Sequence, residues 1–290
     1  MLFRSVVWLF FAWEHRREDK GKEPLVRPEM LRNSQLSGGL IMFCAQFMIQ
    51  AGIFFVVPLY LSVCLGLSAL ETGARLLPLS LTLLLAALGV PKLWPNARPR
   101  FVVRSGLLAL LAGALVLLIA LDTDSGSEIV LVPLLLIGLG IGALASQLGA
   151  VTVSAVPDDQ SPEVGGLQNT MTNLGASIGT ALAGSVMIAT LTSAFIANIQ
   201  ANPAIPDRVK SDATVKLASG VPFISDDDLE AAMDEANVSR RVQDEAMTAY
   251  QDARIDGLKS SLAILGLITV LALFGARRIP TVPVGSAGPP

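Results

Sequence analysis

The side chains best suited to recognising a small molecule are aromatic rings and carboxamides within one apolar stretch. Phe43, Phe47 and Phe54 are interspersed there with Gln46 and Gln50. Residues four apart share one side of a helix, so the two amides and the first two rings occupy overlapping faces. Stacked rings and a few hydrogen bonds suit an amphipathic compound in a mostly apolar pocket. Equally, the rings can face lipid while the amides bond to a neighbouring helix.

Three further polar residues in apolar stretches are candidates for binding. Gln147 and Asn173 are candidates for the same cavity, with the same alternative of helix–helix bonding. Arg75 lies one turn after Glu71, which predicts an ion pair at a membrane edge; binding of an anionic substrate group is the alternative. Glu71 and Glu163 stand at predicted helix starts, where the helix dipole favours a carboxylate, so we interpret both as capping residues.

Other chemistry finds little support in the sequence. His15 is the only histidine, which excludes most histidine-based metal and nucleophile arrangements within this chain. Cys44 and Cys64 are predicted on one helix, about 30 Å apart, and cannot form a disulfide. The acidic run Asp226–Asp228 resembles a calcium loop only superficially, because no glycine occupies the required turn position. We therefore expect no enzyme activity, no metal and no cofactor.

The composition is that of an integral membrane protein. Hydrophobic residues make up 52% of the chain and charged residues 16%, whereas a soluble domain is about a quarter charged. A bilayer-spanning helix needs about 20 mostly apolar residues, and six stretches qualify. We expect spans at 36–65, 72–93, 101–121, 129–156, 163–195 and 257–276. The predicted fold class is all-α and polytopic, with the lipid bilayer as its surroundings, and no basic domain supports a nucleic-acid partner.

The chain divides into further segments around these spans. Residues 1–13 are apolar but too short to span, and charged residues follow them where a signal peptide would have a small-residue cleavage site. We interpret them as the end of a truncated transmembrane helix. The remaining divisions are a loop at 14–35, spans one to five within 36–197, an insert at 198–256, span six within 257–278 and a disordered tail at 279–290.

The insert, residues 198–256, differs from the rest of the chain in composition. It holds twelve acidic and six basic residues, so we expect it to be soluble. Ser225 followed by Asp226–Asp228 marks a helix start. The segment from Ser239 to Ala253 keeps the spacing of a second amphipathic helix. An acidic, partly helical segment outside the membrane is the prediction.

Small residues recur every four positions in two spans. Such ridges let another helix approach closely. The expected helix-packing residues are Gly138, Gly142 and Ser146 in one span and Gly175, Gly179 and Ala183 in another.

Two helix starts carry capping signals. Ser68 and Glu71 fit a capping box, in which each side chain bonds to a free backbone amide of the first turn. Ser161 precedes Pro162, so we expect this serine to cap the fifth span, with the proline at its first position.

The distribution of charge predicts an orientation. Lysines and arginines lie on one side, in the loops 14–35 and 92–100 and at the end of the sixth span just before the tail, although the loop 157–162 on that side has none. The short loops 66–70 and 122–128 on the other side also have none. By the positive-inside rule, both termini are cytoplasmic and the insert is extracytoplasmic, in a multi-pass protein of the plasma (inner) membrane.

The six spans also suggest an inverted repeat of three plus three. Spans one and four carry glutamines, and spans three and six are the most apolar. Spans two and five begin with the similar strings Glu71–Gly73 and Glu163–Gly165.

Three strings resemble a known family in their order and spacing. They are Glu71-Thr-Gly-Ala-Arg-Leu-Leu-Pro78, the glycine run Gly138–Gly142, and Gly165-Gly-Leu-Gln-Asn169 leading to Asn173–Gly179. Together they resemble the carboxy-terminal half of the fourteen-span drug/proton antiporters of the major facilitator superfamily. The resemblance implies that spans one and four line a central cavity, that spans two and five face the other half, and that spans three and six are peripheral. It also implies that the Gly175–Gly179 ridge faces this missing amino-terminal half.

Two functions remain open at this stage. The resemblance implies a secondary active transporter that exports hydrophobic or amphipathic compounds by alternating access, driven by protons, of which this chain is one half. The alternative is a six-span membrane scaffold, or an inactive remnant, whose outer insert binds a partner. No histidine or carboxylate lies in the middle of a span, so proton coupling cannot be assigned to a residue of this chain.

Overall fold

The computed structural model describes Trp13, Arg16 and residues 27–123, 126–217, 220–236 and 238–282. Within these residues the chain is helical and contains no strand, and six helices are long and apolar enough to cross a membrane. The predicted all-α polytopic class is therefore confirmed. The expected helix end at 1–13, apart from Trp13, most of the loop at 14–35 and the tail from residue 283 onward lie outside the described residues.

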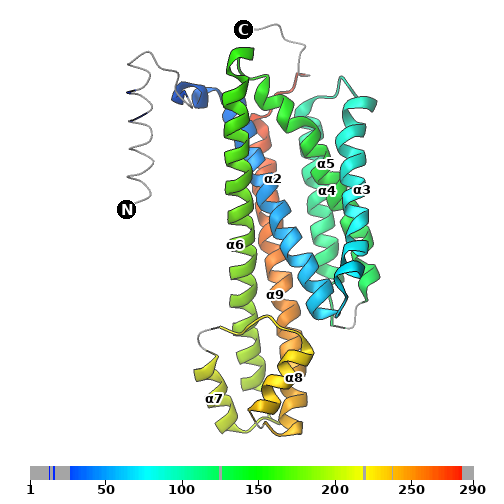
Figure 1. Ribbon diagram of the computed structural model, residues 1–290, viewed down its shortest axis with the longest axis vertical. Coiled ribbons are helices and arrows are strands. Elements are labelled where there is room, and N and C mark those ends of the chain that lie inside the picture. The colour runs from blue at the N-terminus through cyan, green and yellow to red at the C-terminus, as the bar shows by residue number, and fades with distance from the viewer. Residues whose placement is uncertain are drawn as a thin grey trace.

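Six long helices form the bundle in Figure 1. They are α2 (Ser34–Leu59, continued by a π-helical turn at Tyr60–Cys64), α3 (Ala69–Leu93), α4 (Pro99–Ala120), α5 (Leu131–Val153, preceded by a 3-10 turn at Ser127–Val130), α6 (Ser161–Ala201) and α9 (Arg240–Gly275). Two short helices, α7 (Asp207–Lys216) and α8 (Asp226–Glu235), lie between α6 and α9. Further 3-10 turns lie at Pro28–Arg32, Asp158–Gln160 and Ala276–Arg278.

The helix pairing follows the exchange symmetry of a three-plus-three repeat. Helix α2 packs against α6 as α3 packs against α5, and α4 packs against α5 as α2 packs against α9. In such a repeat α2 corresponds to α5, α3 to α6 and α4 to α9. Exchanging each helix with its counterpart converts one pair of each comparison into the other, and it leaves the pairs α2–α5 and α4–α9 unchanged. The match is incomplete in two places: α4–α5 is a more extensive pair than α2–α9, and α6–α9 is an extensive pair that has no comparable counterpart in α3–α4.

Glycines bring the equivalent pairs α2–α6 and α3–α5 into backbone contact. A methyl group on Gly175 or Gly179 would collide with the carbonyl oxygen of Cys44 or Met48 in α2. In the same way, a methyl group on Gly138 or Gly142 would collide with the carbonyl oxygens of Leu79 and Leu83 in α3. In each half of the repeat, two glycines four residues apart thus allow one helix to contact the backbone of another.

The expectation that the Gly175–Gly179 ridge faces an absent half is therefore wrong. Gly175, Gly179 and Ala183 are buried within this chain against its own helices. Small residues permit close approach but do not select the partner. In the other ridge, the third member, Ser146, is half-buried, and its hydroxyl donates to the carbonyl oxygen of Ala143 in its own helix at 2.6 Å.

The exceptional pair α6–α9 extends well beyond a bilayer. Helix α6 has 41 residues, or roughly 60 Å at the usual rise per residue, about twice the hydrocarbon thickness. Helix α9 is continuous from Arg240, so the separate amphipathic helix expected at 239–253 is the first part of this long helix. Gly257 lies within this continuous helix and against α6, where its Cβ would be 2.8 Å from the Met187 carbonyl oxygen.

The projecting ends of α6 and α9 carry α7 and α8 at the lower end of Figure 1 and enclose a second apolar core. The rings of Phe195 and Tyr250 meet edge to face at 5.5 Å. Arg254 is only 3% exposed; its guanidinium pairs with Asp226 at 2.8 Å and donates to the Ile224 carbonyl at 2.9 Å. The insert is thus a folded unit fastened to both long helices.

We predict that Gly179→Ala destabilises the bundle by about 1–3 kcal/mol, because the added methyl meets backbone that cannot rotate away. Gly166→Ala in the same helix is the matched control, since nothing lies within 4 Å of its would-be Cβ. Thermal unfolding of the purified protein in detergent measures both. Equal melting temperatures for the two variants would contradict the α2–α6 contact.

We predict that Asp226→Ala loosens the insert by about 2 kcal/mol, because the buried Arg254 charge loses its carboxylate. Faster hydrogen exchange at backbone amides of 220–224 and 246–255 is the expected readout. Glu230→Ala is the control: its pair with Arg240 is largely exposed, and such pairs contribute less than about 1 kcal/mol. Exchange that is unchanged in Asp226→Ala would show that the ion pair does not hold the insert.

Candidate functional site

Four of the predicted cavity residues form one line along α2. Phe43, Phe47, Gln50 and Phe54 follow one another at spacings of four, three and four residues, the repeat of a single helix face. All four stay partly or fully exposed, and Phe54 is 42% exposed. The rings of Phe43 and Phe47 stack with centroids 6.2 Å apart and planes 8° from parallel. We call this line the α2 stripe; the helices of this chain cover it only in part.

Gln46 lies away from the α2 stripe. It is 3% exposed, and its Oε1 atom has no hydrogen-bond partner among the described residues. Gln46 follows Gly39 by seven residues and so shares its face, and a methyl group on Gly39 would meet Thr152 of α5. Gln46 and Gln50 lie one turn apart, but only Gln46 is buried, so the edge of the contact between α2 and its neighbours falls between the two glutamines.

The remaining cavity candidates stand on other helices. Gln147 is half-buried on α5, and its Nε2 donates to the Ser146 hydroxyl at 3.4 Å. Asn173 is exposed on α6, and its Nδ2 donates to the Asn169 carbonyl at 2.9 Å. Both amides are engaged by their own helix and remain accessible. The structure thus places candidates on α2 and on two of the helices that pack against it, α5 and α6.

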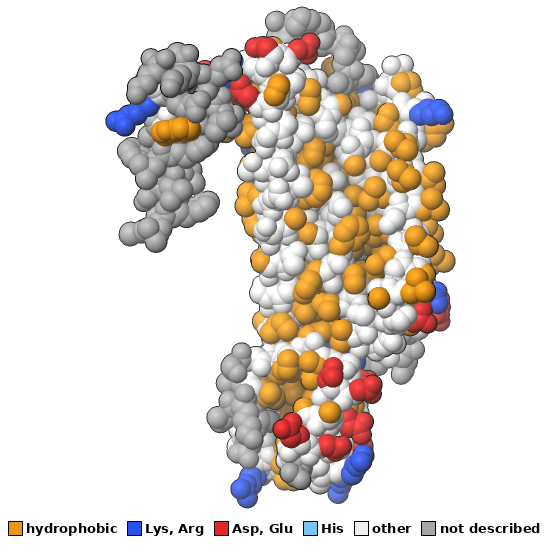
Figure 2. Space-filling view, viewed as in Figure 1, with side chains coloured by type: hydrophobic (Ala, Val, Ile, Leu, Met, Phe, Trp, Pro, Cys, Tyr) orange, Lys and Arg blue, Asp and Glu red, His pale blue; other side chains and the backbone are white. Residues whose placement is uncertain are grey.

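The exposed face of α6 is polar and small along most of its membrane length. In Figure 2, which repeats the view of Figure 1, this helix appears mainly white, unlike the orange patches over α2 and α3. The only large apolar side chain on this face is Leu174, 44% exposed. The polar side chains of this face are costly to present to lipid. Its exposed residues include Gly165, Gly166, Asn169, Thr170, Asn173, Ser177, Thr180, Ala181 and Ser185.

One of the two predicted helix caps is present, at Ser68 and Glu71, and the other, at Ser161, is not. The Glu71 carboxylate accepts from the backbone amide of Ser68 at 2.9 Å, and Ser68 accepts from the Glu71 amide at 3.4 Å, so a capping box opens α3. The expected cap at Ser161 is wrong. The 3-10 turn Asp158–Gln160 already places Ser161 in helical geometry, and no side chain caps α6. An N-cap residue needs extended backbone, which this serine does not have.

The charged residues near the helix starts pair differently from what was expected. Among the described residues, no ion pair joins Glu71 to Arg75, because the carboxylate turns back towards Ser68 and leaves Arg75 exposed. Glu163 accepts from the backbone amide of Arg27 at 3.3 Å and lies 3.6 Å from its guanidinium. This contact fastens the segment before α2 to the start of α6.

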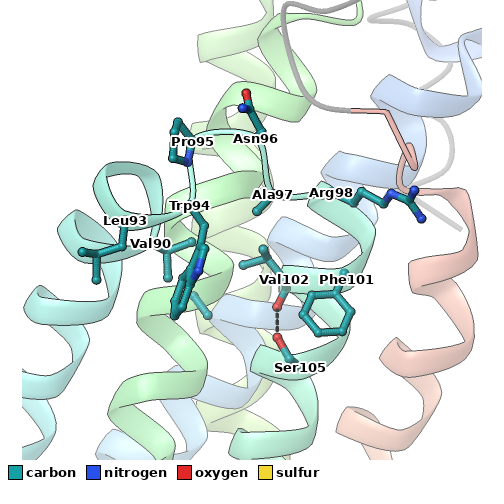
Figure 3. Close-up of a pocket in the computed structure, with 11 residues that line it drawn as sticks. Val90, Leu93, Trp94, Pro95, Asn96, Ala97, Arg98, Phe101, Val102 and Ser105 are labelled. Atoms are coloured by element: carbon teal, nitrogen blue, oxygen red, sulfur yellow. Dashed lines mark hydrogen bonds between the residues drawn. The ribbon is translucent and has the colours of Figure 1, made fainter.

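Sequence reasoning missed the pocket in Figure 3. It has a volume of about 720 Å³ and lies where α3, α4 and the loop between them meet α5, with Trp94 and Phe101 among its walls. None of the predicted cavity residues lines it. Two exposed aromatic residues beside a run of arginines were the signal that could have pointed to it.

A model of the family described as Major Facilitator Superfamily matches residues 1–180. The chain belongs to the Major Facilitator Superfamily. This family consists of transporters, so the expectation that the chain is not an enzyme is confirmed, as is the resemblance drawn from the sequence strings.

Several resistance and transport proteins are similar to the chain. The tetracenomycin C resistance and export protein of Streptomyces glaucescens is 32% identical over 67% of the chain and 36% of its own length. The probable actinorhodin transporter of Streptomyces coelicolor is 25% identical over 76% of the chain and 38% of its own length. The multidrug resistance protein Stp of Mycobacterium tuberculosis is 26% identical over 71% of the chain and 37% of its own length. The chain thus spans little more than a third of the length of each of these relatives.

We predict that Gln46→Leu leaves the stability of this major facilitator chain unchanged or raises it, because the substitution removes a buried oxygen that has no partner. Gln50→Leu, on the α2 stripe, is the matched comparison and should alter stability little. Melting temperatures of the two purified variants measure this. A large drop for Gln46→Leu alone would mean that its amide holds α2 to α5 through a bond absent from the described contacts.

Proposed function

We propose that this chain forms part of a secondary active transporter that exports hydrophobic or amphipathic compounds. The observation that carries the proposal is the α2 stripe, whose stacked rings and amide are covered only in part by the chain's own helices. An aromatic, mostly apolar surface with a few polar groups suits such compounds. The printed names of its relatives, which include a puromycin resistance protein, point to export of this kind.

Alternating access needs a second half against which this one can move. The polar, small face of α6 and the scarcely buried α3 are the surfaces that we assign to an amino-terminal half. That the relatives are more than twice as long as the matched segment supports this assignment. No histidine or carboxylate lies in the middle of a span, so we place the proton-coupling group in that other half.

The proposed location is the plasma (inner) membrane, with both ends of this chain in the cytoplasm. The lysines and arginines of the short loops gather on one side of the bundle, and this bias sets orientation. The acidic insert, residues 198–256, then lies outside the cell.

We predict that Phe47→Ala in the complete transporter slows efflux of a fluorescent amphipathic cation such as ethidium several-fold, because the stacked ring surface is lost. Leu115→Ala is the control, since Leu115 is an exposed apolar residue of α4 that lies outside the α2 stripe. Efflux is followed in cells that express equal amounts of each protein.

Three outcomes of this assay would contradict parts of the proposal. Equal efflux by Phe47→Ala and the parent protein would remove the α2 stripe from the substrate pathway. Efflux that persists when a protonophore collapses the proton gradient would remove proton coupling. No efflux above that of cells without the protein would favour the alternative, a membrane scaffold whose insert binds a partner.

A further inference from the structure

Two apolar grooves flank Phe101 at the basic end of the bundle. The first is the pocket of Figure 3, between α3 and α4, and its lining includes Trp94 and Ala143 of α5. The second runs between α4 and α9, has a volume of about 460 Å³ and is lined by apolar residues that include Phe274. Phe101 and Ser105 line both grooves, so the two lie side by side on α4.

Three arginines border these grooves. Arg98 lines the first, and Arg104 and Arg277 line the second. All three are exposed, and in the part of the chain that the structure describes none of them pairs with a carboxylate within 4.0 Å. Figure 3 shows the Trp94 ring pointing down into the first groove while Arg98 extends the other way, past Phe101. The local charge is therefore positive and unneutralised.

A fourth arginine fixes this arrangement. The Arg100 side chain donates to the carbonyl oxygens of Ile279 at 2.7 Å and Arg277 at 2.6 Å. The Arg100 backbone amide donates to the carbonyl oxygen of Pro280 at 3.2 Å. These bonds tie the start of α4 to the end of α9. Arg277 also lies over the Phe274 ring, 5.8 Å from its centroid. The site is thus held by protein contacts before any ligand binds.

The depth of these groups in the bilayer identifies the ligand chemistry. Arg98 immediately precedes α4, and Arg277 lies two residues after the end of α9, in the 3-10 turn Ala276–Arg278. Both therefore stand where membrane helices meet the headgroups, the level that exposed tryptophan also prefers. Trp94, Phe101 and Phe274 are more than half exposed beside them. Unpaired cations above apolar grooves at this level complement a lipid phosphate above its acyl chains.

We propose that this end of the bundle binds one anionic phospholipid, such as phosphatidylglycerol. Its phosphate lies among Arg98, Arg104 and Arg277, and its two acyl chains enter the grooves on either side of Phe101. The positive end of the α4 dipole adds to the attraction. The site is separate from the α2 stripe and depends neither on transport nor on orientation in the cell.

The test uses Trp94 as a reporter in the full chain. Trp8→Phe and Trp13→Phe leave Trp94 as the single tryptophan. The protein is placed in nanodiscs that contain phosphatidylcholine and a fixed minority of phosphatidylglycerol, and bromine is carried on the acyl chains of one lipid or the other. We expect Trp94 quenching to report about fivefold enrichment of phosphatidylglycerol over its share of the bilayer.

Charge variants separate this site from general attraction to the membrane. Replacing Arg98, Arg104 and Arg277 together by Gln should abolish the enrichment, and replacing them by Lys should retain most of it. The matched control replaces Arg208, Arg240 and Arg241 of the insert by Gln, with the same loss of charge, and should leave the enrichment intact.

Each remaining result would overturn the proposal. Quenching in proportion to bulk composition would show no preference for the anionic lipid. Enrichment that survives the Gln replacements would place the lipid elsewhere. Trp94 that neither brominated lipid quenches would mean that protein covers the groove. If the Gln protein does not fold, thermal stability of the parent decides: no gain from phosphatidylglycerol over phosphatidylcholine would equally reject the site.

Discussion

Backbone contact between glycine-bearing helices is the constraint on which the rest of the bundle depends. Lipid provides no hydrophobic drive for helices to associate, so close packing has to supply much of the stabilisation. Gly175 and Gly179 give α6 that contact with α2, and Gly138 and Gly142 give α5 the same contact with α3. These pairs are equivalent under the three-plus-three repeat. The same arrangement of two glycines therefore sets the distance between helices in both parts of the bundle.

The α6–α9 pair connects this bundle to the insert. The Ser261 hydroxyl of α9 donates to the Ala183 carbonyl of α6 at 2.8 Å within the buried interface, and Gly257 lets the two helices approach near the same level. Because both helices continue unbroken into the insert, they supply part of the apolar core of the insert. A tilt of either helix in the membrane would therefore be transmitted directly to the insert, with the Arg254–Asp226 pair moving as part of it.

The surfaces left open by this packing differ in character. Along α2 the open surface is aromatic with one amide, along α6 it is small and polar, and at the basic end of α4 it combines aromatic rings with arginine. Each kind of surface suits a different neighbour: a substrate, another part of a transporter, and a lipid headgroup with its chains. These assignments rest on one physical rule, that the cost of exposing a group depends on what surrounds it.

The sequence by itself determined the six spans, the all-α class and the family, because twenty apolar residues in a row have few alternatives to crossing a bilayer. It also located the close-packing glycines and the Ser68–Glu71 cap, which depend on neighbours three or four residues away. Only the tertiary structure decided which way each helix is turned. The Gly175–Gly179 ridge faces α2, Gln46 is buried while Gln50 is partly exposed, and Arg100 joins α4 to the end of α9. Helix rotation is set by contacts between residues far apart in the chain, and local spacing carries no information about them.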